Sequence, residues 1–286
     1  MALLSGKVAL VTGAGGGLGR CHALALAKEG AKLVINDLGG ARDGSGKGGQ
    51  SMADAVVDEI KAAGGEAVAN YDTVASVEGG ERMVKAALDA FGQLDICVNN
   101  AGILRDKTLA KLGEDLWDPV VEVHLKGTYC VTRPAYLHMR ERGQGGVIIN
   151  TSSTSGLNGN FGQTNYGAAK AGIWGFSRCL ALEGQKAGIR VHILAPVALT
   201  RLTEDLAGMG TDEMKEKLDP ALVSPLVVFL SSDLAKDQTG TTYYVGGGRI
   251  AEMKMVTAQG VTKTDEGGLW SPEEIAARIN EIRLPE

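Results

Sequence analysis

The sequence predicts an α/β fold in which helices cover both faces of one doubly wound, parallel sheet of seven strands. Short aliphatic and β-branched runs alternate along the chain with longer segments of helical periodicity, and this alternation is typical of parallel strands joined by crossover helices. The runs are apolar on both faces, as expected for a covered sheet. The 286 residues suffice for one such domain, because single cores grow to roughly 250–300 residues.

The predicted elements follow one another in strict alternation. Seven short runs carry the strand pattern: Val8–Thr12, Lys32–Asn36, Glu66–Asn70, Asp95–Asn99, Gly146–Ser152, Arg190–Ala195 and Thr242–Val245. The longer segments between them carry the helical pattern: Leu18–Glu29, Gln50–Ala63, Val77–Phe91, Leu116–Arg142, Asn165–Ala187 and Val223–Ser231. Each helix therefore connects two strands, which is the order of a doubly wound sheet.

A glycine-rich turn joins the first strand to the first helix, with the pattern T-G-x-x-x-G-x-G over residues 12–19. Glycines permit the sharp turn and the approach of a pyrophosphate, and the N-terminus of the helix supplies positive potential. The pattern predicts a Rossmann-like dinucleotide site with four contacts in this turn: Gly13, Gly17, Leu18 and Gly19. The alternative interpretation is an ordinary glycine-rich turn between a strand and a helix.

Asp37 ends the second strand, 18 residues beyond Gly19. An acidic side chain there accepts hydrogen bonds from the adenosine ribose and repels a 2′-phosphate, so the predicted cofactor is NAD and not NADP. Arg42 and Lys47 in the next loop would weaken that repulsion, and the alternative role of Asp37 is to cap a turn. The loop itself, Gly39–Gly49, has six glycines and is predicted to be extended surface chain.

Polar and small residues also follow the third and fourth strands. Ligands bind such sheets at the carboxyl ends of the strands, so these residues are predicted to contact the adenine and ribose groups of the cofactor: Asp72, Thr73, Asn99, Asn100, Ala101 and Gly102.

The candidate catalytic residues lie after the fifth strand. Tyr166 and Lys170 are four residues apart in a predicted helix and therefore share one face. A free tyrosine has a pKa of about 10, and a neighbouring ammonium, together with a positive nicotinamide ring, stabilises the phenolate that a general acid/base needs. The hydroxyl of a serine at the preceding strand end can bind the substrate oxygen. The alternative for the Tyr–Lys spacing alone is a surface or interface pair.

Together these motifs identify the chain as a member of the short-chain dehydrogenase/reductase family over residues 5–250. The matching patterns are T-G-x-x-x-G-x-G, N-N-A-G at residues 99–102 and Y-x-x-x-K at residues 166–170, with Ser153 thirteen residues before Tyr166. The resemblance implies hydride transfer between a nicotinamide and a carbinol carbon. It gives Tyr166 the proton transfer, Lys170 the lowering of the Tyr166 pKa and the binding of the nicotinamide ribose, and Ser153 the orientation of the oxygen.

Two segments depart from the family pattern. The family usually has an asparagine in the fourth helix, whose backbone carbonyl holds a water in a proton relay, and His124 stands in its place here. His124 is therefore a candidate catalytic residue that keeps the relay, with a buried structural role as the equal alternative. Pro-Val-Ala-Leu at residues 196–199 stands where the family commonly has Pro-Gly. By resemblance, Pro196 and Leu199 are expected to contact the cofactor near its nicotinamide amide.

Several unusual stretches resemble the (3R)-hydroxyacyl-CoA dehydrogenase units of the type 2 multifunctional enzymes, also known as 17β-hydroxysteroid dehydrogenases type 4. They are N-D-L-G-G at residues 36–40, A-N-Y-D at 69–72, N-A-G-I-L-R-D at 100–106, H-L at 124–125 and G-N-F-G-Q at 159–163. The resemblance implies oxidation of a 3-hydroxyacyl thioester or of a bulky alcohol such as a steroid 17-hydroxyl. Arg105, Lys107 and Lys111 are candidates for binding the phosphates of an acyl-CoA, and a solvated charged face is the alternative.

The predicted domain organisation is a catalytic domain and an extension. Residues 1–250 form the NAD-binding catalytic domain, including a substrate lid at about 201–220, and residues 251–286 form a C-terminal extension packed on the same domain. The extension contains a helix start at Ser271-Pro272-Glu273-Glu274, with a serine cap, a proline in the first turn and a glutamate three residues after the cap.

Composition favours a small-molecule partner, an alcohol or ketone. The net charge of −5 is spread over interspersed acidic and basic residues, which disfavours nucleic acid as a partner. No apolar run approaches the roughly 20 residues of a membrane helix, no leader pattern precedes the first strand, and the four cysteines lack the spacing of a metal site. We therefore expect a cytoplasmic protein without metal and, by family resemblance, a homodimer or homotetramer built on the helices 116–142 and 165–187.

Three hypotheses about function stay open. The first is an NAD-dependent dehydrogenase of hydroxyacyl-CoA or steroid-like alcohols, and the second is the same chemistry on another ketone or alcohol. The third is a non-catalytic NAD-binding sensor, for which an intact Ser153, Tyr166 and Lys170 would be unnecessary.

Overall fold

The computed structural model describes residues 2–40, 43–45, 51–200, 211–264 and 268–284. The chain divides into two compact units, Met1–Glu252 and Met253–Glu286. The boundary lies two residues after the predicted end of the catalytic domain, and the packing of the extension on that domain stays a prediction.

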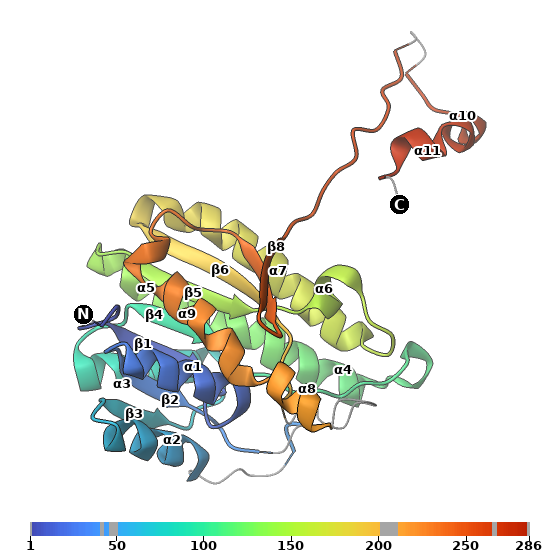
Figure 1. Cartoon of the computed structure of the whole chain (residues 1–286). Helices are drawn as coiled ribbons and strands as arrows, with labels where there is room; N and C mark the ends of the chain where they lie inside the picture. The colour runs from blue at the N-terminus through green and yellow to red at the C-terminus, as the bar shows by residue number, and fades with distance from the viewer. Residues whose placement is uncertain (1, 41–42, 46–50, 201–210, 265–267, 285–286) are drawn as a thin grey trace. The chain divides into compact units, whose positions relative to one another are not determined.

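The first unit is built on one sheet with the strand order β3-β2-β1-β4-β5-β6-β7-β8 (Figure 1). The strands are β1 (Val8–Thr12), β2 (Lys32–Asn36), β3 (Ala67–Asn70), β4 (Ile96–Asn99), β5 (Gly146–Thr151), β6 (Ile189–Pro196), β7 (Thr242–Gly246) and β8 (Arg249–Met253). All neighbours from β3 to β7 pair in parallel. The order reverses between β1 and β4, and such a switch point is where doubly wound sheets bind ligands.

The seven predicted strands are confirmed, but the predicted number of seven is wrong because β8 adds an eighth. Gly247 and Gly248 separate β7 from β8, and both have positive φ angles, 58° and 76°. Two consecutive residues in that region form the tight turn of a hairpin. The hairpin therefore returns the chain along the edge of the sheet.

Helices cover both faces of the sheet, as predicted. One apolar cluster joins the sheet to α1 (Gly17–Lys28), α2 (Ser51–Ala62) and α9 (Ser224–Ser231). The other joins it to α3 (Val77–Phe91), α5 (Gly127–Arg142) and α7 (Thr164–Gly184). Alternate residues of β1 serve the two clusters, because successive side chains of a strand point to opposite faces: Ala9 and Val11 pack on one side, Val8 and Leu10 on the other.

Short helical elements complete the described part of the chain. They are η1 (Leu109–Lys111), α4 (Glu114–Val121), η2 (Glu122–Lys126), α6 (Thr154–Asn158), η3 (Gln185–Ala187), α8 (Asp212–Lys217), η4 (Pro220–Val223), η5 (Asp233–Ala235), α10 (Pro272–Ala277) and α11 (Ile279–Ile282). The predicted helix start at Ser271 is confirmed: its hydroxyl accepts from the backbone of Glu274, whose carboxylate accepts from the backbone of Ser271 in return.

The predicted helix 116–142 is not one regular helix. It is divided into α4, the π-helical turn η2 and α5. Hydrophobic periodicity does not distinguish a π turn from an α turn, because the two differ by one residue in hydrogen-bond spacing. The π turn contains His124, which is 2% exposed.

Two predicted segments fall partly outside the described residues. Residues 41–42 and 46–50 of the glycine loop and residues 201–210 of the predicted lid are not described. Of the predicted lid, the described part contains α8 and the beginning of η4.

Candidate active site

A cavity of about 400 Å³ opens at the carboxyl ends of the strands. It is lined by fourteen of the predicted site residues: Gly13, Gly17, Leu18, Asp37, Asp72, Thr73, Asn100, Ala101, Gly102, His124, Ser153, Tyr166, Lys170 and Pro196. Residues predicted to bind the cofactor and residues predicted to move a proton therefore share one cavity.

The glycine-rich turn and the N-N-A-G segment form one hydrogen-bonded unit. The Thr12 hydroxyl accepts the backbone N–H groups of Asn100 and Ala101 at 3.0 and 3.1 Å. In return, the Asn100 side-chain amide donates to the backbone carbonyls of Thr12 and Gly13 at 3.0 and 3.2 Å. The segment after β4 thus fixes the shape of the turn after β1.

Three predicted cofactor contacts, Gly19, Asn99 and Leu199, are not among the residues that line the cavity. A Cβ atom at Gly19 would stand 2.2 Å from the carbonyl oxygen of Gly13, so only glycine lets α1 approach the turn this closely. Asn99 is buried and donates to Thr132 and Asn150 at 2.8 Å. The backbone N–H of Leu199 donates to the Leu218 carbonyl at 2.7 Å. Their contact with a cofactor stays a prediction.

Asp37 both caps a turn and lines the cavity. One carboxylate oxygen accepts the backbone N–H of Gly15 at 2.8 Å, and the other accepts that of Gly39 at 2.7 Å. The two interpretations of Asp37 from the sequence are therefore compatible, because these bonds hold a negative charge in the cavity wall.

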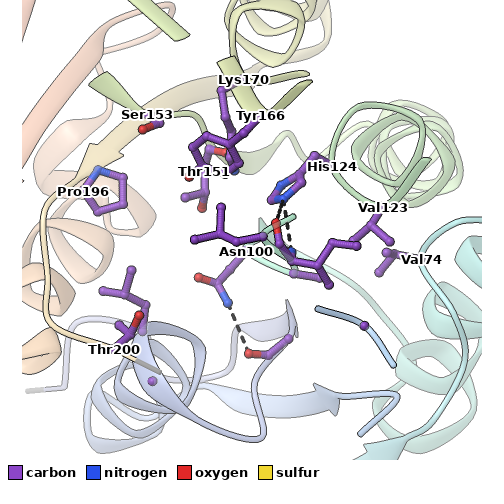
Figure 2. Close-up of a pocket in the computed structure, with 18 of the residues that line it drawn as sticks. Val74, Asn100, Val123, His124, Thr151, Ser153, Tyr166, Lys170, Pro196 and Thr200 are labelled. Carbon is purple, nitrogen blue, oxygen red and sulfur yellow. Dashed lines mark hydrogen bonds between the residues drawn. The ribbon is translucent and has the colours of Figure 1, made fainter. Parts of the chain in front are cut away.

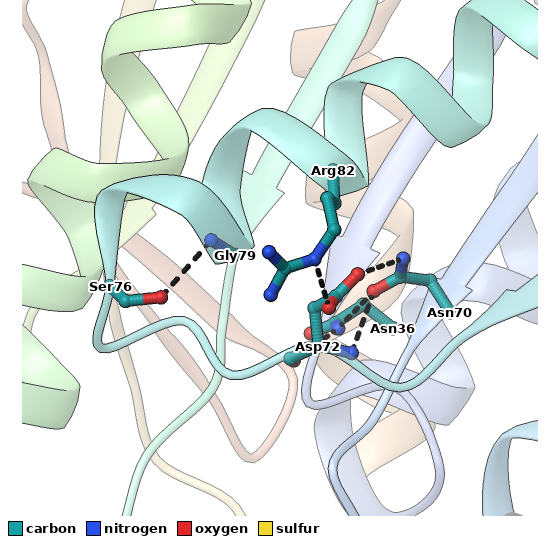
Figure 3. A network of polar contacts seen from close by, with 6 residues as sticks. All are labelled: Asn36, Asn70, Asp72, Ser76, Gly79 and Arg82. Carbon is teal, nitrogen blue, oxygen red and sulfur yellow. Dashed lines mark hydrogen bonds and ion pairs between the residues drawn. The ribbon is translucent and has the colours of Figure 1, made fainter.

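Two buried asparagines that the sequence analysis missed hold Asp72 in place (Figure 3). The Asn36 amide donates to the side chain of Asn70 at 2.8 Å and to the backbone carbonyl of Asp72 at 2.9 Å. The Asn70 amide donates to the Asp72 carboxylate at 2.8 Å, and Arg82 donates to its other oxygen at 2.6 Å. The sequence signal that could have revealed them is that each of two apolar strands, β2 and β3, ends in an asparagine.

Tyr166 and Lys170 lie one turn apart near the start of α7, as predicted. The Lys170 ammonium donates to the backbone carbonyl of Thr151 at 2.6 Å and lies 5.5 Å from the centre of the Tyr166 ring. Ser153 is buried and caps α6, where its hydroxyl accepts the backbone N–H of Ser155 at 3.1 Å. Figure 2 shows Tyr166, Lys170 and Thr151 gathered beside His124.

Burial dominates the proton affinities of this group. Burial raises the pKa of Tyr166 to about 12, with a smaller lowering by a hydrogen bond with Ser153 and a smaller raising by the charge of Asp106. Burial also lowers the pKa of Lys170 to about 7. In the chain by itself Tyr166 is therefore a phenol at neutral pH, and the predicted lowering of its pKa depends on further positive charge in the cavity.

His124 is locked to the segment that follows β4. Its Nε2 atom lies 2.8 Å from the carbonyl oxygen of Ile103 and 3.1 Å from the nitrogen of the same residue. Its ring meets the Tyr166 ring edge to face, with centres 5.2 Å apart. Burial, and secondarily the charge of Lys170, lower the pKa of His124 to about 3. The ring is therefore neutral, and both sequence interpretations of His124 stay open.

Gly102 makes room for this histidine, and we expect Gly102→Ala to destabilise the fold. An added Cβ atom would stand 2.4 Å from the Cε1 atom of His124, and forced overpacking costs about 1–3 kcal/mol. Urea unfolding measures the loss. The control is Gly175→Ala in α7, where an added Cβ meets nothing within 4 Å, so no loss is expected there. Equal midpoints for the Gly102 variant and the wild type would contradict the close contact.

A sequence profile of the short chain dehydrogenase family matches residues 7–209. A putative short-chain type dehydrogenase/reductase of Mycobacterium tuberculosis is 50% identical over 96% of this chain and 93% of its own. A crystal structure of a short chain dehydrogenase from Mycobacterium avium is 43% identical, with a TM-score of 0.85 over 99% of this chain and 98% of that one. The likeness confirms the predicted α/β architecture.

The resemblance to the type 2 multifunctional enzymes is also confirmed. The peroxisomal multifunctional enzyme type 2 of Mus musculus is 46% identical over 94% of this chain. The match covers 36% of the mouse enzyme, so this chain spans about a third of that relative. In the described part of the chain no helix is long and apolar enough to cross a membrane, and the cellular compartment stays a prediction.

Proposed function

Because the chain belongs to the short chain dehydrogenase family, we propose that it is an NAD-dependent oxidoreductase that interconverts a secondary alcohol and a ketone. The proposed substrate is either a 3-hydroxyacyl-CoA or a 17β-hydroxysteroid-type alcohol. One observation carries it: Tyr166, Lys170 and Ser153 line the same cavity as Asp37 and the glycine-rich turn.

The cavity wall suits NAD at its adenosine and pyrophosphate ends. Gly16, Gly17 and Leu18 line the cavity where α1 begins, and no side chain among the described residues caps this helix start. Its first N–H groups are therefore available to phosphate oxygens. The fixed carboxylate of Asp37 can accept hydrogen bonds from ribose hydroxyls and would repel a 2′-phosphate. Bound NAD would supply the hydride acceptor for the alcohol.

The side chains around Tyr166 can manage the proton of this reaction. In oxidation, the Tyr166 phenolate would take the proton of the alcohol hydroxyl, and in reduction the phenol would return it to the ketone oxygen. Ser153 would bind that oxygen and orient it. Lys170, already fixed by Thr151, would hold the nicotinamide ribose. The His124 ring would keep the Tyr166 ring in position through their edge-to-face contact.

Of the three basic residues considered for the phosphates of an acyl-CoA, Arg105 is already engaged. Its guanidinium donates to the backbone carbonyls of Asp43 and Asp115 at 2.8 Å. Lys107 and Lys111 are exposed. We propose that these two lysines, and not Arg105, meet the CoA phosphates.

Exposed apolar side chains support the proposed homodimer or homotetramer. Tyr129 and Leu137 on α5 are 44% and 39% exposed, and Leu182 on α7 is 70% exposed. Both helices are those on which the sequence predicts the assembly, and covering such side chains in an interface is favourable.

The experiment that tests the proposed function follows the absorbance of the reduced cofactor. NADH and NADPH are each supplied with acetoacetyl-CoA, a 17-ketosteroid and a small aryl ketone. We expect oxidation of NADH with acetoacetyl-CoA and weaker use of NADPH. Turnover of the steroid or the aryl ketone alone would replace the thioester assignment, preference for NADPH would overturn the role of Asp37, and no turnover at all would favour a non-catalytic NAD-binding protein.

A further inference from the structure

A phenylalanine stands at the tip of an exposed turn between α6 and α7. The backbone N–H of Gln163 donates to the Asn160 carbonyl at 3.3 Å, which closes a turn of four residues. Gly162 has a φ angle of 79° and that of Phe161 is not positive, as in a type II turn. Phe161 is 90% exposed, the highest fraction of any large apolar side chain that the structure describes. The turn itself does not need this ring, because proline is the common residue at that position.

The base of this turn is part of the cavity wall. Asn160 and Gln163, on either side of Phe161, both line the cavity that contains the catalytic group. The oxygen of the Gln163 amide accepts from Asn160 and Ser155 at 2.9 and 2.8 Å. The nitrogen of the same amide donates to the Asp106 carboxylate at 2.7 Å. These contacts hold the turn in place, so the exposed ring of Phe161 is presented directly beside the cavity.

A second exposed segment lies against the turn and carries two lysines. A backbone bridge joins Lys107 to Gln163, and Figure 1 shows the chain before α4 and the chain after α6 at the same end of the first unit. The segment continues into η1, where Leu109 is 68% exposed and Lys111 is also exposed. Neither this segment nor the turn contains an acidic residue from Lys107 to the end of η1 or from Gly159 to Gln163. The surface that they form is therefore apolar and positively charged.

The acidic residues nearest to this surface in the sequence have other surroundings. Asp106, directly before Lys107, has one carboxylate oxygen held by Gln163 and the other buried. Glu114 and Asp115 lie in the first turn of α4, where the helix dipole stabilises negative charge. The surface thus favours an anionic ligand, and an exposed phenyl ring adds a face on which a flat ring can stack.

The proposed acyl-CoA substrate contains both of these features. Coenzyme A carries an adenine ring and phosphate groups at the far end of a long pantetheine arm. Its thioester would lie beside Ser153 and Tyr166, in a cavity of about 400 Å³ that the proposed NAD also enters. The nucleotide of the substrate therefore has to lie outside the cavity. The turn at Phe161 leads from the cavity wall to such an outer surface.

We propose that Phe161, Lys107 and Lys111 form a docking surface for the adenosine bisphosphate of an acyl-CoA. The Phe161 ring stacks on the adenine, and the two ammonium groups bind the phosphates, for which such flexible point charges are suited. The inference rests on the proposed function and deepens it, because it selects the acyl-CoA and not the steroid-type alcohol as the substrate.

The test compares two thioesters with the same acyl group, acetoacetyl-CoA and acetoacetyl-N-acetylcysteamine. The second keeps the thioester and the nearest part of the arm and lacks the nucleotide. We expect Phe161→Ala to raise KM for acetoacetyl-CoA by about fivefold or more, the effect of losing one base-stacking contact. Neither kcat for acetoacetyl-CoA nor KM for the short thioester should follow. Joint replacement of Lys107 and Lys111 by alanine should raise the same KM and reduce its dependence on salt.

Matched variants separate the docking surface from general effects on the chain. Leu234→Ala shortens a 66% exposed side chain in η5, and Lys236→Ala removes an exposed charge nearby. Neither should change KM. Phe161→Trp keeps an aromatic face and should keep KM for acetoacetyl-CoA at or below that of the wild type.

Two kinetic outcomes would overturn the proposal. One is an unchanged KM for acetoacetyl-CoA in Phe161→Ala. The other is an equal rise of KM for both thioesters, which would show that the substitution disturbs the cavity wall. If size-exclusion chromatography then also shows a changed oligomeric state, Phe161 belongs to a contact between copies of this chain.

A second readout needs no turnover. Isothermal titration calorimetry measures the binding of coenzyme A and of pantetheine to the protein saturated with NAD. Phe161→Ala should weaken the binding of coenzyme A by the same factor as in the kinetics and leave that of pantetheine unchanged. No binding of coenzyme A to the wild type would overturn the proposal.

The two readouts also distinguish this proposal from the proposed function. Failure to reduce any thioester or ketone, together with coenzyme A binding that depends on Phe161, would refute the proposed function and leave the docking surface. Turnover of acetoacetyl-CoA with equal affinity of Phe161→Ala and wild type for coenzyme A would refute the docking surface alone.

Discussion

Replacement of Tyr166 by phenylalanine is expected to lower kcat by about 10²- to 10⁴-fold, the usual contribution of a positioned general acid or base. Phenylalanine keeps the ring that contacts Lys170 and His124 and removes the hydroxyl that would carry the proton. Binding of NAD should change little, because the glycine-rich turn and Asp37 are untouched. Steady-state kinetics and isothermal titration calorimetry with NAD measure the two effects separately.

The control for this result is Tyr243→Phe. The Tyr243 hydroxyl lies 3.4 Å from the side chain of Gln238, and Tyr243 does not line the cavity, so neither kcat nor NAD binding should change. Undiminished turnover in Tyr166→Phe would remove Tyr166 from the reaction. A matching loss of NAD binding would show that the variant disturbs the cavity and not only the proton transfer.

Stability is expected to fall steeply as the pH is lowered from about 6.5, because three histidines are buried in neutral form. Burial lowers the pKa of His22 to about 4 and those of His124 and His192 to about 3, from 6.5. Below pH 6.5 the unfolded chain binds protons at these sites and the folded chain does not, so acid favours unfolding. The stabilisation is complete above 6.5 and is lost toward the folded pKa values.

Each of these protons contributes about 1.4 kcal/mol per pH unit, so the three together give a slope of about 4 kcal/mol per unit between pH 4 and 6. Urea unfolding at a series of pH values measures this slope. His192→Leu should lower the slope by about 1.4 kcal/mol per pH unit, the contribution of one proton. Leucine is a suitable replacement because neither ring nitrogen of His192 has a hydrogen-bond partner in the described chain. A slope unchanged by that substitution would contradict the assignment.

The sequence predicted the elements whose residues carry a local pattern. The strands up to β7 are apolar on both faces, so composition alone separates Val8–Thr12 or Lys32–Asn36 from the helices around them. Arg249–Met253 carries no such pattern, because its side chains lie at an edge and are largely exposed. β8 depends on the turn at Gly247 and Gly248, which only the conformation reveals.

The same limit applies to the site. Tyr166 and Lys170 could be predicted because they share one helical turn and match a known motif. The pairing of Asn36 with Asn70 joins residues 34 positions apart, and that of Gln163 with Asp106 joins residues 57 apart. Neither pairing leaves a periodic signal in the sequence. Supporting contacts of this kind become visible only when the chain is folded.

The hydrogen bonds between Thr12 and Asn100 have a consequence for the order of folding. They connect residues 88 positions apart, so the glycine-rich turn acquires its final shape only when β4 has paired with β1. Contacts of such high sequence separation form late and slow the folding of a domain. A nascent chain that has emerged only as far as β3 would contain the complete glycine motif without the geometry of the proposed dinucleotide site. The proposed cofactor site therefore forms in a cooperative event and is not carried by an autonomous N-terminal segment.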